Sequence, residues 1–174
     1  MRPKPAAKNR RSGLSLLEMM AATAIMATLT ASVVVVMRSG YAVWNAQEAD
    51  IDVLDNGYGV LRHFVTKMRQ ATTVTAITAS GNTQGSLSFT TSTGATCIWA
   101  RNSSSDVYFN NGTSNQLLAK SINSMTFTGY KADGITATTT VTDIQVVQCQ
   151  VQITLPRGAG VTRTLTTRAW IRSW

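Results

Sequence analysis

The hydrophobic and polar positions of this chain follow three successive patterns, and each pattern predicts a different element. Residues 14–37 are apolar or hydroxyl-bearing apart from one acid, and these 24 residues would form a helix of about 36 Å, enough to cross a hydrocarbon core of about 30 Å. Residues 38–70 place apolar side chains at spacings of three and four, which is typical of an amphipathic helix. After residue 70, short runs rich in β-branched residues are separated by turn signals and predict strands.

The amphipathic segment carries one apolar stripe, which we expect to pack on a sheet of the same chain. Gly57 and Gly59 each cost the helix about 1 kcal/mol relative to Ala, so we expect a bend or a close approach to a strand there. His63 lies off the stripe and is predicted to be exposed. The stripe consists of Ile51, Leu54, Tyr58, Leu61, Val65 and Met68.

The segment after Gln70 predicts an antiparallel sheet. Strands are expected at residues 73–78, 86–91, 96–101, 106–110, 125–130, 142–155 and 162–172. Asn111-Gly112 and Asp133-Gly134 mark turns. Each of the last two strands has an apolar face that we expect to lie on the helix, so the fold class is α+β, a long helix packed on an antiparallel sheet. The two faces comprise Cys149, Val151, Ile153 and Leu155, and Val161, Leu165, Ala169 and Ile171.

The charge distribution predicts the orientation of the apolar span across the membrane. The chain has 16 Lys+Arg against 8 Asp+Glu, and five of the cations lie in the first eleven residues. A basic segment ahead of an apolar span predicts that residues 1–13 stay in the cytoplasm while the rest crosses the inner membrane. We interpret these cations as a topology signal rather than as a nucleic-acid surface, so no nucleic-acid partner is expected.

Charged residues are also segregated within the amphipathic segment. The acids Glu48, Asp50, Asp52 and Asp55 come first, and Arg62, Lys67 and Arg69 follow. One interpretation is a solvated face whose charges agree with the helix dipole. The other is a contact between the acidic half of one subunit and the basic half of another in a staggered filament.

Residues that carry chemistry are sparse. The sequence has one histidine and no glycine-rich phosphate loop, HExxH, GxSxG or CxxC motif, so we expect a protein that is not an enzyme and has no cofactor or metal. Asp106, Asp133 and Asp143 fall in or beside turns, where solvated acids are expected and a calcium loop is the alternative. Cys97 and Cys149 are predicted to lie outside the cytoplasm, either as a disulfide or as two small core residues.

Glu18 is the residue that an ordinary membrane anchor or secretory signal does not explain. A carboxylate inside an apolar span costs about 2–3 kcal/mol on insertion scales. The span is also about twice as long as the apolar region of a typical secretory signal peptide. A secreted enzyme with a cleaved signal peptide is therefore the weaker hypothesis.

The residues around Glu18 resemble a known signal. The run Arg10-Arg11-Ser12-Gly13-Leu14-Ser15-Leu16-Leu17-Glu18 is similar to the type IV prepilin signal, a basic leader ending in Gly before an apolar helix with Glu at its fifth position. The one departure is Leu14, where the family more often has Phe. The resemblance implies that prepilin peptidase cuts between Gly13 and Leu14 and methylates Leu14, and that Glu18 pairs with a neighbouring subunit's N-terminus during assembly.

The pattern further along the chain sharpens this resemblance. Residues 117–127, the segment Tyr130-Lys131-Ala132-Asp133-Gly134 and the two long strands after it are similar to minor pseudopilin J of type II secretion systems and to PilW-like minor pilins. The implied function is a structural subunit of a periplasmic pseudopilus. A minor pilin of a type IV pilus, acting in assembly priming, adhesion or DNA uptake, is the alternative.

This resemblance divides the chain into four parts. Residues 1–13 are a cytoplasmic leader, 14–37 a transmembrane helix, 38–70 its amphipathic continuation, and 71–174 a periplasmic β-rich domain. The implied location is the bacterial inner membrane, with a single pass. The implied partners are prepilin peptidase, other pilins or pseudopilins, and the inner-membrane assembly platform.

Overall fold

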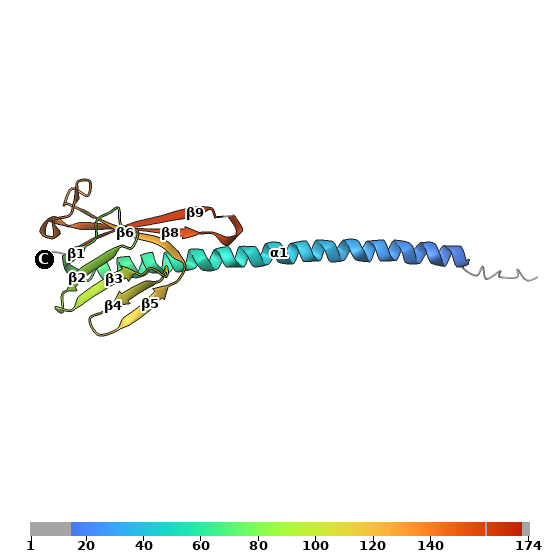
Figure 1. Ribbon diagram of the computed structural model, residues 1–174, viewed down its shortest axis with the longest axis horizontal. Helices are drawn as coiled ribbons and strands as arrows, with labels where there is room; N and C mark the ends of the chain where they lie inside the picture. The colour runs from blue at the N-terminus through green and yellow to red at the C-terminus, as the bar shows by residue number, and fades with distance from the viewer. Residues whose placement is uncertain (1–14, 159, 172–174) are drawn as a thin grey trace, which may run out of the picture. The chain divides into compact units, whose positions relative to one another are not determined.

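The computed structural model describes residues 15–158 and 160–171 and contains one long helix followed by two antiparallel sheets (Figure 1). The helix, α1 (Leu16–Met68), has 53 residues. The chain divides into two compact units after Trp44. The first unit contains the N-terminal part of α1, and the second contains residues 45–68 of α1 together with all strands.

The first sheet has five strands in the order β1-β2-β3-β4-β5, so each strand is hydrogen-bonded to its neighbour in sequence. This arrangement follows from short connections between strands, which favour antiparallel hairpins. Asn111-Gly112 forms one of the turns, and Gly112 has a positive φ of 91°. The strands are β1 (Ala71–Ile77), β2 (Ser86–Thr91), β3 (Thr96–Arg101), β4 (Val107–Asn110) and β5 (Asn115–Ala119).

The second sheet has four strands in the order β7-β6-β8-β9, all antiparallel. Two short 3-10 helices, η1 (Val141–Asp143) and η2 (Pro156–Gly158), lie in its connections. The strand expected at residues 142–155 begins only after η1, and its long alternating part is present. The strands are β6 (Ile122–Tyr130), β7 (Ala137–Thr138), β8 (Val146–Thr154) and β9 (Thr162–Trp170).

The two sheets meet at Gly85, where the backbone of one approaches the backbone of the other. The Gly85 N–H donates to the Met125 carbonyl at 2.7 Å, and the Met125 N–H donates to the Thr83 carbonyl at 2.9 Å. A Cβ atom at position 85 would lie 2.3 Å from the Met125 carbonyl oxygen. Only glycine permits this contact, so Gly85 fixes how β6 joins the first sheet.

The core forms between the C-terminal part of α1 and the two sheets. Trp99 is 1% exposed and lies within 5.3 Å, centroid to centroid, of the rings of Phe64, Phe89 and Phe109. In β8 the residues Cys149, Val151 and Ile153 are all fully buried, as their alternation predicts. The predicted α+β class, a long helix packed on antiparallel β-structure, is confirmed, although the strands form two sheets rather than one.

The face that α1 presents to the sheets agrees only in part with the predicted stripe: Leu61 and Met68 are buried, and Leu54 and Val65 pack against the core. Ile51 is 62% exposed and Tyr58 57% exposed, so neither packs in the core. A spacing that alternates three and four has a period of 3.5, and such a stripe rotates by about 20° per seven residues around a helix of 3.6 residues per turn. The rotation of α1 about its axis is also fixed at Gly57, because strands approach the helix closely there. Its buried residues are Gly57, Val60, Leu61, Phe64 and Met68.

Candidate functional site

The first turn of α1 places Ser15 and Glu18 together. The Glu18 N–H donates to the Ser15 hydroxyl at 3.2 Å and to the Ser15 carbonyl at 3.0 Å. Ser15 therefore satisfies an N–H group that would otherwise lack a partner at the helix start. The spacing Ser-x-x-Glu is that of a capping box, and it also places the Glu18 carboxylate in the first turn, where the helix dipole favours negative charge.

The described part of the first unit, residues 15–44, has no core of its own. Every described residue from Ser15 to Trp44 is exposed, including Leu16 at 80% and Val36 at 71%. α1 is long and apolar enough here to cross a membrane. This segment therefore fits a single-pass membrane anchor.

Hydroxyl side chains in this apolar part of α1 are hydrogen-bonded within the helix. The hydroxyls of Thr23 and Thr28 donate to carbonyls three residues earlier, at 3.0 and 2.8 Å. Those of Thr30 and Ser32 donate to carbonyls four residues earlier, both at 2.8 Å. Because no hydroxyl of this set is left without an acceptor, the helix surface is suited to a lipid environment.

Comparison with known proteins adds the deciding observation. The family model described as the prokaryotic N-terminal methylation motif matches residues 8–34. The N-terminal segment is type IV prepilin-like. The match covers the end of the basic leader, from residue 8, together with Glu18 and the first turns of the apolar helix, and it indicates a type IV pilin-like structural subunit. No curated protein and no solved structure matches the chain.

The prepilin-like segment contains residues whose structure is not described. Gly13 and Leu14, the predicted cleavage and methylation positions, lie outside the described residues. Glu18 lies within the described part, in the first turn of α1. Sequence reasoning missed the cap by Ser15, although the Ser-x-x-Glu spacing was present to indicate it.

Cys97 and Cys149 are both free and buried in this structure. Cys97 lies in β3 opposite Phe89, whereas Cys149 lies in β8 between Phe127 and Thr167. The two thiols thus belong to different sheets, where each packs as a small apolar residue. Burial raises the pKa of both thiols, and for Cys97 the nearby Lys67 partly opposes this shift. Such thiols are poor nucleophiles.

His63 is not the exposed residue that the sequence predicts. The Trp99 indole N–H donates to its Nδ1 at 3.2 Å, and the His63 ring lies edge-on to Phe109 at 4.5 Å between centroids. Burial, followed by the nearby Lys67 cation, lowers the pKa of His63 below its ordinary 6.5. The imidazole is therefore a neutral hydrogen-bond acceptor at the margin of the core.

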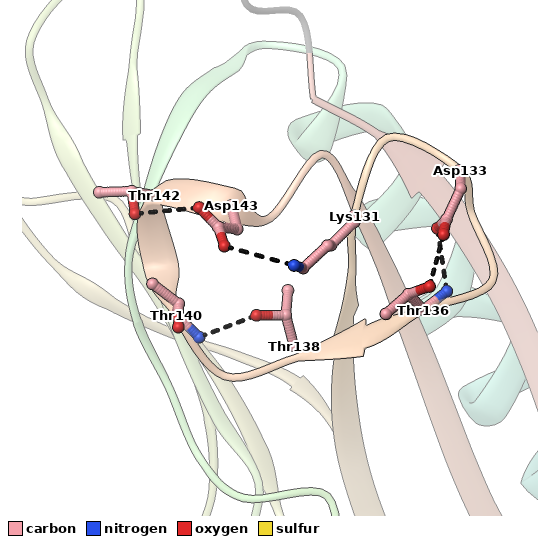
Figure 2. A network of polar contacts seen from close by, with 7 residues as sticks. All are labelled: Lys131, Asp133, Thr136, Thr138, Thr140, Thr142 and Asp143. Atoms are coloured by element: carbon pink, nitrogen blue, oxygen red, sulfur yellow. Dashed lines mark hydrogen bonds and ion pairs between the residues drawn. The ribbon is translucent and has the colours of Figure 1, made fainter.

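Two of the acids expected near turns, Asp133 and Asp143, have a local structural role. In the loop of residues 131–143, Asp133 accepts bonds from Thr136, while Asp143 lies 3.8 Å from the Lys131 ammonium (Figure 2). Asp133 also accepts a bond from the Ile135 N–H. The Thr136 hydroxyl and these N–H groups lower the pKa of Asp133. Within residues 15–158 and 160–171 no three His, Cys, Asp or Glu side chains are grouped to hold a metal ion.

Proposed function

We propose that this chain is the precursor of a non-catalytic filament subunit, cut between Gly13 and Leu14 and methylated at Leu14. The match of residues 8–34 to the methylation motif carries the proposal. An exposed apolar helix with a single acid in its first turn supports it. The filament is a periplasmic pseudopilus of a type II protein secretion system.

Cleavage gives Glu18 a partner. The new ammonium group on Leu14 would be an unpaired charge among apolar helices, which is costly. The Glu18 carboxylate of a neighbouring subunit neutralises it when the helices stack with the correct axial stagger. The cap by Ser15 orders the same turn, so the carboxylate is held at the start of a formed helix rather than on a frayed end.

The membrane position follows from the same elements. Residues 1–13 lie in the cytoplasm, residues 14–37 cross the inner membrane, residues 38–70 continue the helix, and residues 71–174 are periplasmic. The basic leader ahead of the apolar span supports this orientation. The partners are prepilin peptidase, the other pseudopilins and the inner-membrane assembly platform.

Mass analysis of the N-terminus tests the processing step. The protein extracted from membranes should begin at methylated Leu14, and Gly13→Val should stay uncut because a bulky side chain must fit at the scissile bond. Gly13→Ala, with the smallest possible side chain, is the matched control and should be cut at least in part. A mature chain that begins beyond Ala27 would show that the leader is a conventional secretory signal.

Deletion of the gene separates the pseudopilus from its alternative. Loss of protein secretion with normal surface pili supports the secretion filament. Loss of pili with normal secretion would instead assign the chain to a type IV pilus as a minor pilin.

A further inference from the structure

The exposed apolar part of α1 ends in two aromatic residues. Tyr41 is 65% exposed and Trp44 70% exposed, and their spacing of three places them on one side of the helix. With Met37 and Gly40 they line an open groove. Within residues 15–158 and 160–171, the Tyr41 hydroxyl and the Trp44 indole N–H have no hydrogen-bond partner. The groove therefore combines apolar walls with two polar groups that need partners.

Two single charges bound the apolar run of α1. Glu18 and Arg38 are twenty residues apart, with no charged residue between them. At 1.5 Å per residue this is about 30 Å of helix, which equals the thickness of a hydrocarbon core. Arg38 is exposed and has neither an ion pair nor a hydrogen bond from its side chain among the described residues. When Glu18 lies at one edge of the hydrocarbon core, Arg38 therefore lies at the other.

This spacing places the two aromatic residues at the level of the lipid headgroups. Tyr41 and Trp44 follow Arg38 by about 5 and 9 Å of helix, and the interfacial layer on each side of a bilayer is about 5–8 Å thick. Long side chains on a helix lean toward its N-terminus, so the Trp44 ring lies closer to the hydrocarbon than its Cα does. Tyr and Trp favour this level because the ring contacts acyl chains while the polar tip bonds to headgroups and water.

The same groove is poorly suited to a second helix. Close pairs of helices in lipid need small residues along the contact, whereas Gly40 is the only small residue among the four that line this groove. A Cβ atom on Gly40 would meet nothing within 4 Å, so the chain's own packing does not require glycine there. A neighbouring helix would also separate the polar tips of Tyr41 and Trp44 from headgroup oxygens and water, which a phospholipid supplies.

We propose that Arg38, Tyr41 and Trp44 bind a phospholipid of the leaflet in which the apolar run ends, and that this site sets the depth of α1 in the membrane. The lipid phosphate pairs with Arg38. The Tyr41 hydroxyl and the Trp44 indole N–H donate to headgroup and ester oxygens, and an acyl chain lies along the groove. A fixed depth keeps Glu18 of an unassembled subunit at the opposite edge, where water reaches it. The inference rests on the membrane span proposed above and adds its depth.

Depth-resolved quenching of tryptophan fluorescence tests the level of Trp44. The purified full chain is placed in phosphatidylcholine/phosphatidylglycerol vesicles whose acyl chains carry bromine either near the headgroup or near the methyl end. The difference between the wild-type chain and Trp44→Phe isolates the signal of Trp44. We expect stronger quenching by the shallow bromine and a depth of about 15–20 Å from the bilayer centre. Leu29→Trp in the Trp44→Phe background is the control and should lie within about 5 Å of the centre.

Thiol labelling in the same vesicles tests whether lipid occupies the groove. Gly40→Cys places a thiol in the groove and Gln47→Cys places one about two turns further along α1, while both native thiols are buried. A membrane-impermeant maleimide should label Gly40→Cys at least about tenfold more slowly than Gln47→Cys, because lipid covers the first position.

Further substitutions in the Gly40→Cys chain assign the effect to the proposed side chains. Trp44→Ala removes one wall of the groove and should raise the labelling rate, whereas Val43→Ala, an apolar truncation on another side of the helix, should leave it unchanged. Arg38→Glu repels the lipid phosphate and should raise the rate, whereas Arg38→Lys keeps the charge and should not.

Three results would overturn the proposal. If Trp44→Phe changed quenching at neither depth while Leu29→Trp was quenched at the bilayer centre, the helix would span the membrane without this lipid site. If Gly40→Cys formed disulfide-linked dimers at every ratio of lipid to protein, the groove would hold a second copy of α1. If Leu29→Trp were not quenched at all, the membrane span would be wrong and the lipid site with it.

Discussion

The N-terminal part of α1 and the unit that follows it are both rich in apolar side chains, but the first exposes them and the second buries them. In residues 16–44 the large apolar side chains are exposed, whereas the unit from residue 45 buries Trp99, Phe89 and Phe127 almost completely. Both segments are apolar enough to require burial. The second unit supplies it from its own sheets, and the first has no described residue that covers it.

This difference separates two sources of stability. The globular unit is held by burial of apolar surface within one chain, at about 25 cal/mol per Å². The exposed helix forms all its backbone hydrogen bonds internally, which is what a lipid environment demands, and leaves its side chains for lipid or for other helices. Substitutions should therefore act on folding in one region and on assembly in the other.

The largest expected effect on folding is in the aromatic core. Trp99→Ala removes a side chain that contacts Phe64, Phe89 and Phe109 and should lower the free energy of unfolding by about 3–5 kcal/mol. Leu29→Ala, at a position 58% exposed, should change it by less than about 0.5 kcal/mol. Urea unfolding of the full chain in detergent, followed by tryptophan fluorescence or circular dichroism, measures both. Equal losses would contradict the separation of the two regions.

Glu18 should show the reverse pattern. Glu18→Ala should leave unfolding of the globular unit unchanged but weaken contacts between subunits by about 3–5 kcal/mol, because it leaves the N-terminal ammonium of a neighbour unpaired. Crosslinking of subunits in membranes measures this loss.

Ser15→Ala is the control that separates assembly from helix capping. It removes the bond from the Glu18 N–H to the Ser15 hydroxyl and should cost the helix about 1 kcal/mol, while the carboxylate is kept. If Ser15→Ala and Glu18→Ala reduced crosslinking equally, the role of Glu18 would be capping alone.

The two helix glycines should respond with opposite signs. A Cβ at Gly57 meets Leu165 at 2.8 Å, whereas a Cβ at Gly59 meets nothing within 4 Å. Gly57→Val should lower the free energy of unfolding by about 1–3 kcal/mol through overpacking. Gly59→Ala should raise it by up to about 1 kcal/mol because alanine favours the helix. Denaturation midpoints of both variants decide this, and a stabilising Gly57→Val would mean that β9 does not pack on α1.

The reactivity of the two thiols measures how accessible the core of the globular unit is to a reagent in water. Cys97 and Cys149 are free and buried, so a thiol reagent should modify the folded chain slowly and modify two thiols after unfolding without reductant. Mass analysis of the labelled protein counts them. If no thiol reacted after unfolding, the two cysteines would be joined in a disulfide.

The elements predicted well from the sequence are those with strong local patterns. The apolar run and the spacing after it predict α1, and the bounds of β2 and β3 agree with the predicted residues 86–91 and 96–101. β5 and β7 were missed. β7 has two residues, and β5 is exposed over most of its length, so neither has the alternation that marks a half-buried strand.

The errors on α1 have a common physical cause. The apolar positions of residues 51–68 are compatible with two adjacent stripes on the helix. The local pattern does not show which of the two faces the sheets. The close approach of Gly57 and Leu165, which are more than a hundred positions apart in the sequence, determines which face of α1 packs on the sheets. His63 was misplaced for the same reason, because its partner Trp99 comes from another element. The cap at Ser15 is different, since its signal is local and was available.

The smallest expected effect is the contribution of His63 to the pH dependence of the free energy of unfolding. It tests whether the edge of the core around His63 is closed to water. Its folded pKa is lower than 6.5, whereas in the unfolded chain it should be about 6.5. Above that pH both states are neutral and the full stability is present. As the pH falls from about 6.5 toward the folded pKa, the unfolded chain binds a proton that the folded chain does not, so the free energy of unfolding decreases. A protonated ring would also turn its Nδ1 into a donor facing the Trp99 N–H.

The variant His63→Gln isolates this contribution. Glutamine keeps an acceptor for the Trp99 indole N–H but does not titrate, so the carboxylates that also titrate in acid affect both proteins alike. Urea unfolding at pH 7.5 and pH 5.0 should show a larger loss of stability in the wild-type chain than in the variant. Equal losses would mean that His63 is as accessible to protons in the folded chain as in the unfolded one, and that the margin of the core at Phe109 and Lys67 is open to water.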